Sequence, residues 1–278
     1  MKIYETIDHG GYSVVYRCIH NDIERAVKIV DLKTRSNGKL ITAAEERLHI
    51  SELMAIQILQ KYPHKNIIDF IDIKHNHAIR DGLWHMGPTS EIVMELGEYT
   101  LTEIINQNQG DIYFLNPIAE GVVLGIRHLH MHNIIHRDIK HDNVVLVKGV
   151  PKIIDLGFAF LSSKEGDWKA LTTTCGSRCN MSPEVIKGCY NGKISDCWSL
   201  GVLLYNIFTN AHPFDSDDVK TLAKNIIRCR VNPCKNFDAL SKSHKEDILS
   251  FLNLTPVMRA TADDDLSFFC HDSRKNAL

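Results

Sequence analysis

Three side chains within residues 136–143 have the types and the spacing that phosphoryl transfer requires. Asp138 can orient a hydroxyl nucleophile, Lys140 can bring positive charge to a developing anion, and Asn143 can offer an amide oxygen to Mg²⁺. The transferred phosphoryl group needs positioning and charge neutralisation more than covalent help. This segment therefore predicts phosphoryl transfer, provided that the rest of the chain supplies a nucleotide site.

A second carboxylate follows the apolar strand predicted at 152–154. Asp155, in Asp155-Leu156-Gly157, would reach the same cleft as Asn143. Two oxygen ligands suit Mg²⁺ held against nucleotide phosphates. On its own, an Asp at a strand end can equally be a turn former. The combination with residues 136–143 favours a metal ligand.

A lysine and a glutamate form the next candidate pair. Lys28 lies on a predicted strand, where its ammonium could reach phosphate oxygens and pair with a carboxylate. A strand lysine is otherwise usually a solvated surface residue. Glu52, on the helix predicted at 42–61, is the candidate partner because its spacing from the apolar face of that helix points it toward the sheet. Glu45 and Glu46 are competitors.

The segment 7–15 predicts a strand, a turn and a second strand, with small residues that let backbone amides approach phosphates. Two glycines in a β-turn more often make only a hairpin. Alone, this motif is therefore a weak indication of phosphate binding. The candidate nucleotide-binding residues of this segment are Ile7, Asp8, His9, Gly10, Gly11, Tyr12, Ser13, Val14 and Val15.

The elements that must hold these residues fall into two groups. Residues 3–96 are strand-like and contain one helix, whereas residues 97–270 are predominantly helical. Residues 74–90 have little apolar periodicity and predict a mobile loop between two strands. Strands are predicted at 13–18, 25–30, 143–146 and 152–154, and helices at 42–61, 101–108, 117–132, 195–209, 219–229 and 244–252.

Composition and charge exclude several classes of protein. The net charge of the 278 residues is -2 and the basic residues are scattered, so we expect no DNA or RNA site. The N-terminus lacks an apolar signal region, and no segment approaches the roughly 18 apolar residues of a membrane span. We expect a monomer without membrane contact, in the cytoplasm, the nucleus or both.

Cysteines and histidines could suggest metal or disulfide chemistry. The eight cysteines contain no C-x-x-C pair, which favours reduced structural thiols. His128, His130 and His132 form an H-x-H-x-H run. On the helix predicted there, successive histidines point about 200° apart, which spoils a shared metal site.

Taken in order, these residues resemble the eukaryotic protein kinases over about residues 3–270. The matching motifs after the glycine-containing turn are Ala26-x-Lys28, Glu52, His136-Arg137-Asp138, Asn143, Asp155-x-Gly157, Ser182-Pro183-Glu184, Asp196-x-Trp198-Ser199-x-Gly201 and Arg259. The resemblance implies the bilobal α+β fold of that family, with a small β-rich lobe at 3–96 and a larger, mainly helical lobe at 97–270. It also implies ATP and Mg²⁺ as cofactors. We expect one catalytic domain without a regulatory domain, because little of the given sequence lies outside residues 3–270.

The resemblance assigns a role to each chemical group. Lys28 would bind the α- and β-phosphates of ATP and pair with Glu52. Asp138 would orient the substrate hydroxyl, and Lys140 would approach the γ-phosphate. The residues that would hold Mg²⁺ are Asn143 and Asp155.

The adenine site follows from the same resemblance. Met94 looks like the gatekeeper, and the Glu95 carbonyl and Gly97 backbone would meet adenine. The family's acidic ribose contact has no clear counterpart in residues 98–101. The side chains that would sandwich the adenine ring are Ile7, Val15, Ala26 and Val145.

Lys140, two residues after Asp138, is typical of serine/threonine kinases, so protein Ser or Thr is the expected acceptor. Motifs around 174–186 and 203–215 resemble the calmodulin-dependent-kinase-like group, closest to its AMP-activated and checkpoint branches. Cell-cycle or stress signalling follows only by family analogy. Asp142 could favour an upstream Arg in the substrate by ion pairing, or be a plain loop carboxylate.

The resemblance also suggests regulation by phosphorylation. An arginine beside the catalytic Asp is commonly neutralised by phosphate on the activation segment, here 155–184. Thr173 occupies the activating position for an upstream kinase, and Thr172 and Thr174 could substitute, although a threonine run is often only a polar loop. A structural ion pair is expected between Glu184 and Arg259.

Departures from the family pattern keep a second hypothesis open, a pseudokinase or docking scaffold with weak nucleotide binding. Asp8 and Ser13 replace glycines beside the expected phosphates, and Leu156 replaces the common Phe, a volume-tolerant change. His141 replaces a frequent proline without an evident reason. The segment expected to face the peptide substrate also changes, at Arg178, Asn180 and Ser182.

Overall fold

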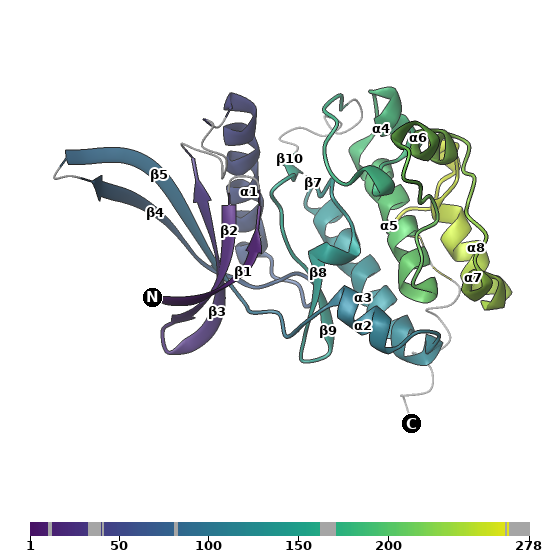
Figure 1. Cartoon of the computed structure of the whole chain (residues 1–278), viewed down its shortest axis with the longest axis horizontal. Helices are drawn as coiled ribbons and strands as arrows, with labels where there is room; N and C mark the ends of the chain where they lie inside the picture. Colours follow the sequence, from purple (N-terminus) through teal and green to yellow (C-terminus); the bar gives the residue numbers. More distant parts are fainter. Residues whose placement is uncertain are drawn as a thin grey trace.

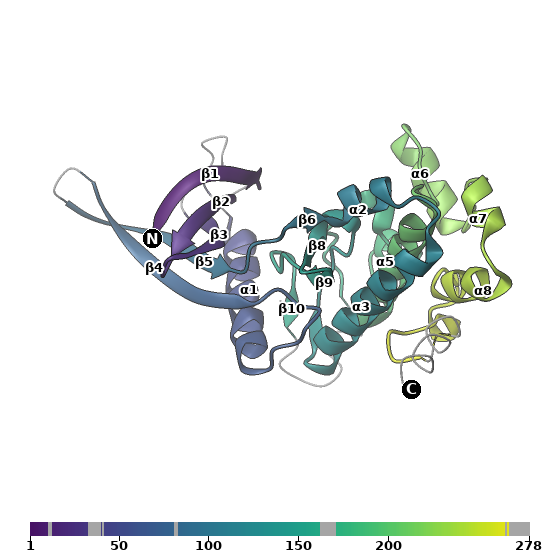
Figure 2. The same ribbon diagram turned by 90° about the horizontal axis from the view of Figure 1, so that it is seen from below.

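The computed structural model describes residues 1–10, 13–32, 40, 42–80, 83–161, 171–264 and 266. Gly11 and Tyr12 of the expected phosphate loop lie outside these residues. Strands β1 to β5 and helix α1 occupy one side of the molecule, and helices α2 to α8 occupy the other (Figure 1 and Figure 2). The small sheet-rich part and the larger helical part therefore follow each other along the chain.

The first part is a five-stranded antiparallel sheet in the order β1-β2-β3-β5-β4. The prediction of a mobile loop at 74–90 is wrong, because β4 and β5 continue through it and pair from Phe70 with Met94 to Arg80 with Leu83. Backbone hydrogen bonds of an antiparallel pair need no apolar periodicity. The strands are β1 (Lys2–His9), β2 (Ser13–His20), β3 (Ile23–Asp31), β4 (Phe70–Arg80) and β5 (Leu83–Met94).

Helix α1 (Ala43–Lys61) begins at a capping box. The Thr42 hydroxyl accepts from the Glu45 N–H at 3.3 Å, and the Glu45 carboxylate accepts from the Thr42 N–H at 2.8 Å. This exchange satisfies two backbone donors at the helix start and fixes its first turn. Glu45 therefore belongs to the helix cap, while Glu52 lies on the buried face of the same helix.

The second part is built around α3 and α5. Helix α3 begins five residues before Pro117, at Ile112, because the Asp111 side chain caps it by accepting from the Phe114 N–H at 3.0 Å. The five-residue helices α4 and α7 were not predicted, since so short a helix shows little periodicity. The helices are α2 (Leu101–Gln107), α3 (Ile112–Met131), α4 (Pro183–Lys187), α5 (Gly192–Thr209), α6 (Val219–Ile227), α7 (Lys235–Ala239) and α8 (Lys242–Phe251).

Short strands and 3₁₀ turns complete the second part, and those between α3 and α4 carry most of the residues of chemical interest. Their hydrogen bonds also tie the two parts together, since the Ile68 N–H donates to the Ile153 carbonyl and the Ile153 N–H to the Asn66 carbonyl, at 3.0 and 2.9 Å. The elements are β6 (Tyr99–Thr100), β7 (Ile134–Ile135), the 3₁₀ turn η1 (His141–Asn143), β8 (Val144–Val147), β9 (Val150–Ile153), β10 (Phe160–Leu161), η3 (Arg178–Asn180) and η4 (Pro256–Met258).

Candidate active site

Lys28 joins three elements through two ion pairs. Its Nζ lies 2.6 Å from Glu52 Oε1 on α1 and 2.8 Å from Asp155 Oδ1 after β9. Burial by itself would lower the pKa of Lys28, but the two carboxylates outweigh burial and raise it. The positive charge of Lys28 in turn lowers the pKa of Asp155 to about 2. Of the three candidate glutamates, Glu52 is the one that pairs with Lys28 in the structure.

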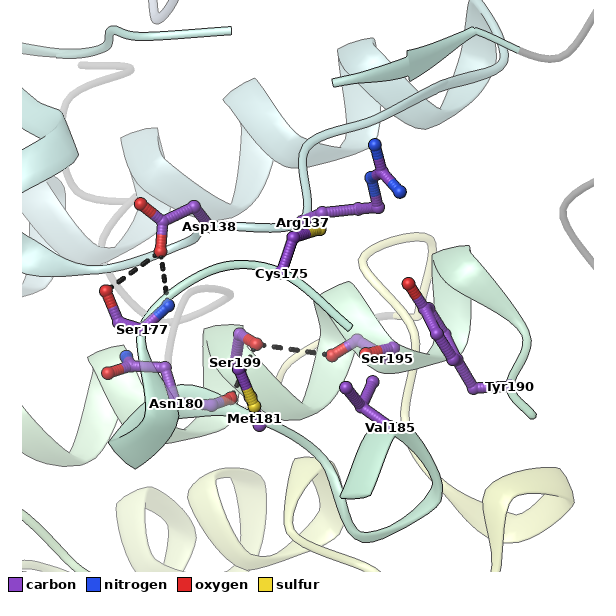
Figure 3. Close-up of a pocket in the computed structure, with 10 residues that line it drawn as sticks. All are labelled: Arg137, Asp138, Cys175, Ser177, Asn180, Met181, Val185, Tyr190, Ser195 and Ser199. Atoms are coloured by element: carbon purple, nitrogen blue, oxygen red, sulfur yellow. Dashed lines mark hydrogen bonds between the residues drawn. The ribbon is translucent and has the colours of Figure 1, made fainter. Parts of the chain in front are cut away.

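Asp138 is buried and its carboxylate is hydrogen-bonded on both oxygens. Oδ1 accepts from the backbone N–H and the hydroxyl of Ser177, at 2.8 and 2.9 Å (Figure 3). Oδ2 lies 3.0 Å from Lys140 Nζ and 3.1 Å from Asn143 Nδ2. These contacts hold an ionised carboxylate in one orientation, as a group that orients a hydroxyl must be held.

Ser177 is the residue of this cluster whose contact with Asp138 the sequence analysis missed. Its approach depends on Gly176, which has φ +86° and whose added Cβ would collide with the Arg137 carbonyl oxygen. Only glycine adopts that backbone freely and leaves that space. The sequence feature that could have indicated this contact is a glycine directly before a hydroxyl residue, Gly176-Ser177.

The backbone around Asp138 is held by Asp196 of α5. The Asp196 carboxylate accepts from the backbone N–H groups of His136 and Arg137, at 2.8 and 2.9 Å. His130 Nε2 lies 3.0 Å from the same carboxylate. Arg137 has φ +65°, an uncommon conformation for a residue with a side chain, and these hydrogen bonds oppose its relaxation.

Asn143 and Asp155 come together as two oxygen-bearing groups. The Ile154 N–H donates to the Asn143 carbonyl at 3.0 Å, which puts Asp155 beside η1. Asn143 Nδ2 donates to the Asp138 carbonyl at 2.7 Å, so the amide oxygen is the atom of that side chain suited to a cation. Asp155 Oδ1 accepts hydrogen bonds from Lys28 Nζ and the Gly157 N–H. Asp155 Oδ2 is therefore the second oxygen suited to a cation. This donor set fits Mg²⁺.

Four of the residues expected around adenine lie in two contacting pairs. Ala26 on β3 pairs with Met94 on β5, and the position of a Cβ on Gly97 would be 2.8 Å from the Cβ of Val145. Gly97 thus packs directly against Val145, where a larger residue would collide. The Glu95 N–H donates to the Asp69 carbonyl at 2.9 Å, and the Glu95 carboxylate lies 2.8 Å from Lys152 Nζ.

The described ends of the expected phosphate loop form a turn. The Gly10 N–H donates to the Ser13 carbonyl at 2.7 Å, and Val15 pairs with Lys28 across β2 and β3. Asp8 is exposed, and its carboxylate accepts from the neighbouring His9 N–H at 2.7 Å. The register therefore places the loop's second strand beside the lysine.

The altered segment at 178–182, which was predicted to face the peptide substrate, is held by hydrogen bonds of its own. Asn180 Nδ2 donates to the Ile139 carbonyl at 3.0 Å, and the Ser199 hydroxyl donates to the Asn180 carbonyl at 2.7 Å. The hydroxyl of buried Ser182 lies 3.1 Å from that of Ser195. Polar residues at these positions are therefore accommodated by polar partners.

Two further residues that differ from the family pattern, His141 and Leu156, also make contacts in the structure. His141 Nδ1 lies 2.8 Å from the Thr102 hydroxyl and 3.2 Å from the carboxylate of exposed Asp142. Leu156 is buried in the same core cluster as Ala55 and Ile56 of α1. His141 therefore has polar partners, and Leu156 lies in the apolar core.

The structure also describes Thr173, the residue predicted to be phosphorylated, and the predicted structural ion pair. Thr173 is exposed, and its carbonyl accepts from the Tyr190 hydroxyl at 2.8 Å. Arg137 and Tyr190 line one pocket with Asp138 (Figure 3). The predicted pair of Glu184 and Arg259 is present, with Arg259 Nη2 3.1 Å from Glu184 Oε2.

The remaining histidines and cysteines form no metal centre in the described part of the chain, where no group of three or more His, Cys, Asp or Glu could hold an ion. His128 instead stacks on His64 and contacts His132 edge to face, with ring centroids 4.6 Å apart in both cases. The cysteines of the described residues are all free thiols.

Comparison with known proteins identifies the class. The model of the protein kinase domain matches residues 1–268, and the chain therefore belongs to the protein kinase family. The fold is the bilobal α+β fold of that family, as the sequence predicted.

Curated relatives carry the same class in their names. The chain is 29% identical to "Serine/threonine-protein kinase PLK4" of Drosophila yakuba over 97% of its length. It is 30% identical to "Serine/threonine-protein kinase shk2" of Schizosaccharomyces pombe over 87%, and 30% identical to "Probable serine/threonine-protein kinase fhkD" of Dictyostelium discoideum over 93%. The chain covers 33%, 38% and 35% of these relatives, about a third of their lengths.

Among the described helices, none has the length and apolar character needed to cross a membrane.

Proposed function

We propose that this chain catalyses transfer of the γ-phosphate of ATP to serine or threonine hydroxyls of protein substrates. The observation that carries the proposal is the pair of ionic clusters, Lys28 with Glu52 and Asp155, and Asp138 with Lys140 and Asn143. The first cluster presents a fixed ammonium for phosphate oxygens. The second presents a fixed carboxylate for an acceptor hydroxyl.

In the proposed reaction, Asp138 orients the acceptor hydroxyl and takes its proton as the oxygen attacks the γ-phosphorus. The bond from the γ-phosphorus to the bridging oxygen breaks, and ADP leaves. Lys28 holds the α- and β-phosphates, while Lys140 neutralises charge on the γ-phosphate. Asn143 and Asp155 would hold Mg²⁺, which supplies further charge neutralisation at the phosphates.

The adenine ring would lie between the sheet and β8. We assign Met94 as gatekeeper and the backbones of Glu95 and Gly97 as adenine contacts. The contact of Gly97 with Val145 and the pairing of Ala26 with Met94 support this placement. The apolar residues proposed to enclose the ring are Ile7, Val15, Ala26 and Val145.

Exposed Asp142 is proposed to favour a basic residue upstream of the phosphoacceptor by ion pairing.

Phosphate on exposed Thr173, added by an upstream kinase, would pair with Arg137 and order the activation segment. We also propose membership of the calmodulin-dependent-kinase-like group and a role in cell-cycle or stress signalling, by a monomer in the cytoplasm or nucleus. Motif resemblance supports the group assignment and, by family analogy alone, the signalling role.

A pseudokinase is the second candidate, and exposed Asp8 beside the phosphate loop favours it. Hydrogen bonds around Asn180 and Ser182 argue against a degenerate substrate segment. A phosphate-transfer assay with Mg²⁺, ATP and a basic Ser/Thr peptide decides between the two, with Asp138→Asn as the control. We expect turnover that Asp138→Asn reduces strongly. Equal incorporation by both proteins would support the scaffold function.

A further inference from the structure

The second oxygen of Glu52 has a buried partner on its own helix. His49 Nδ1 lies 3.3 Å from Glu52 Oε2, while Lys28 Nζ lies 2.6 Å from Oε1. The side chains of His49 and Glu52 are 1% and 2% exposed. The Glu52 carboxylate is therefore divided between two donors, one on β3 and one a helical turn before it on α1.

In the hydrogen bond between His49 and Glu52, His49 is the donor. An ionised carboxylate only accepts hydrogen bonds, so Nδ1 must carry the proton that points at Glu52. His49 Nε2 has no hydrogen-bond partner within the part of the chain that the structure describes. A buried nitrogen without a partner is unfavourable, and an apolar side chain would fill this site without that cost. The single contact with Glu52 is therefore what distinguishes a histidine from a leucine here.

We propose that His49 is a positioning residue for nucleotide binding, acting through Glu52 on Lys28. The inference rests on the proposed function, because it assumes that Lys28 meets ATP phosphates. His49 itself contacts neither nucleotide nor acceptor. Its role is to stop the Glu52 carboxylate from turning away from Lys28.

The need for such a restraint follows from the competition for Lys28. Its ammonium is shared between Glu52 and Asp155, at 2.6 and 2.8 Å. If the Glu52 carboxylate rotates, Lys28 is drawn to Asp155 alone, one of the two groups assigned to Mg²⁺. Lys28 then leaves the position from which it serves the phosphates, and ATP affinity falls.

Two nearly isosteric substitutions test the proposal. His49→Asn can place an amide N–H near the position of Nδ1, whereas His49→Leu has similar size and no donor. We expect the Kd of Mg²⁺-ATP, measured by titration without peptide, to rise about tenfold in His49→Leu, the worth of one hydrogen bond to a charged group. The KM for ATP should follow, with the KM for peptide unchanged. His49→Asn should stay close to the wild type.

A double-substitution cycle tests whether His49 acts through Glu52. In a Glu52→Gln background, His49→Leu should weaken ATP binding no further. Equal weakening in both backgrounds, equal weakening by Asn and Leu, or no weakening by Leu would each overturn the proposal. Should His49→Leu unfold, as judged by circular dichroism, His49→Ala supplies the comparison without a donor. A wild-type chain that binds no ATP would instead refute the proposed function, and the inference with it.

Discussion

Ser177 donates two hydrogen bonds to the same oxygen of Asp138, one from its backbone N–H at 2.8 Å and one from its hydroxyl at 2.9 Å. The hydroxyl also accepts from Lys140 Nζ at 3.1 Å. The orientation of the Asp138 carboxylate, which is proposed to be catalytic, therefore depends directly on the position of the segment that carries Ser177. A displaced segment would leave Asp138 without two of its donors.

Ser177→Ala should lower kcat/KM for a peptide substrate about tenfold, because it removes one hydrogen bond to a charged group while the backbone bond persists. Ser177→Thr retains the hydroxyl and is the matched control. Steady-state kinetics with peptide as the varied substrate measures the effect. Equal kcat/KM for the Ala and Thr variants would show that the hydroxyl contributes nothing to Asp138.

Lys28→Met should lower kcat/KM for ATP by at least about 100-fold. It removes the ammonium expected at the phosphates, and with it the positive charge that pairs with Glu52 and Asp155. The control is Lys74→Met, which breaks a partly exposed ion pair with Asp72 on β4. That pair should matter little. Similar kinetics for the two variants would argue against the nucleotide site.

Thr173→Ala should prevent activation, because no phosphate can then pair with Arg137. The measurement compares peptide phosphorylation by wild-type and variant protein after treatment with an activating kinase, with phosphate located by mass spectrometry. Thr172→Ala is the matched control in the same exposed run. Unchanged activity in Thr173→Ala would remove Thr173 as the switch.

Glu184→Gln should destabilise the fold by about 3 to 5 kcal/mol, because it leaves the buried guanidinium of Arg259 without its counter-charge. Arg259 also donates to the Ile194 carbonyl at 3.0 Å and lies 5.1 Å from the Trp198 ring centroid. Urea unfolding measures the change. Glu246→Gln, in the exposed pair with Lys242, is the control and should cost about 0.5 kcal/mol or less.

His212 should make stability depend on pH. Burial lowers its pKa from 6.5 to about 4, so the unfolded chain binds the proton more readily than the folded chain between these values. Stability from this group is complete above pH 6.5 and falls as the pH drops toward 4, by at most about 3 kcal/mol. His212→Asn keeps an acceptor for the Phe214 N–H and does not titrate. Between pH 7 and pH 4.5, the free energy of unfolding of the His212→Asn variant should fall by less than that of the wild-type protein.

The resemblance carried by the order of chemical groups along the chain predicted the fold class correctly. It also predicted that Lys28, Asp138, Asn143 and Asp155 form one site, and that assignment stays a prediction. Few folds bring such groups to one place in that order, and helix periodicity already favoured Glu52 over its neighbours. Periodicity failed at residues 74–90, where the pairing of β4 with β5 depends on backbone hydrogen bonds between strands and not on apolar alternation.

Contacts between distant segments were decided only by the tertiary structure. Ser177 meets Asp138 across 39 residues, and Lys28 meets Asp155 across 127. Local pattern carries no information on such distances, because they depend on how β7, β9 and α5 pack. The sequence by itself determined which groups are available for the proposed phosphoryl transfer. The fold decided which oxygen of each carboxylate is bound, and by what, because burial makes every unpaired polar atom costly.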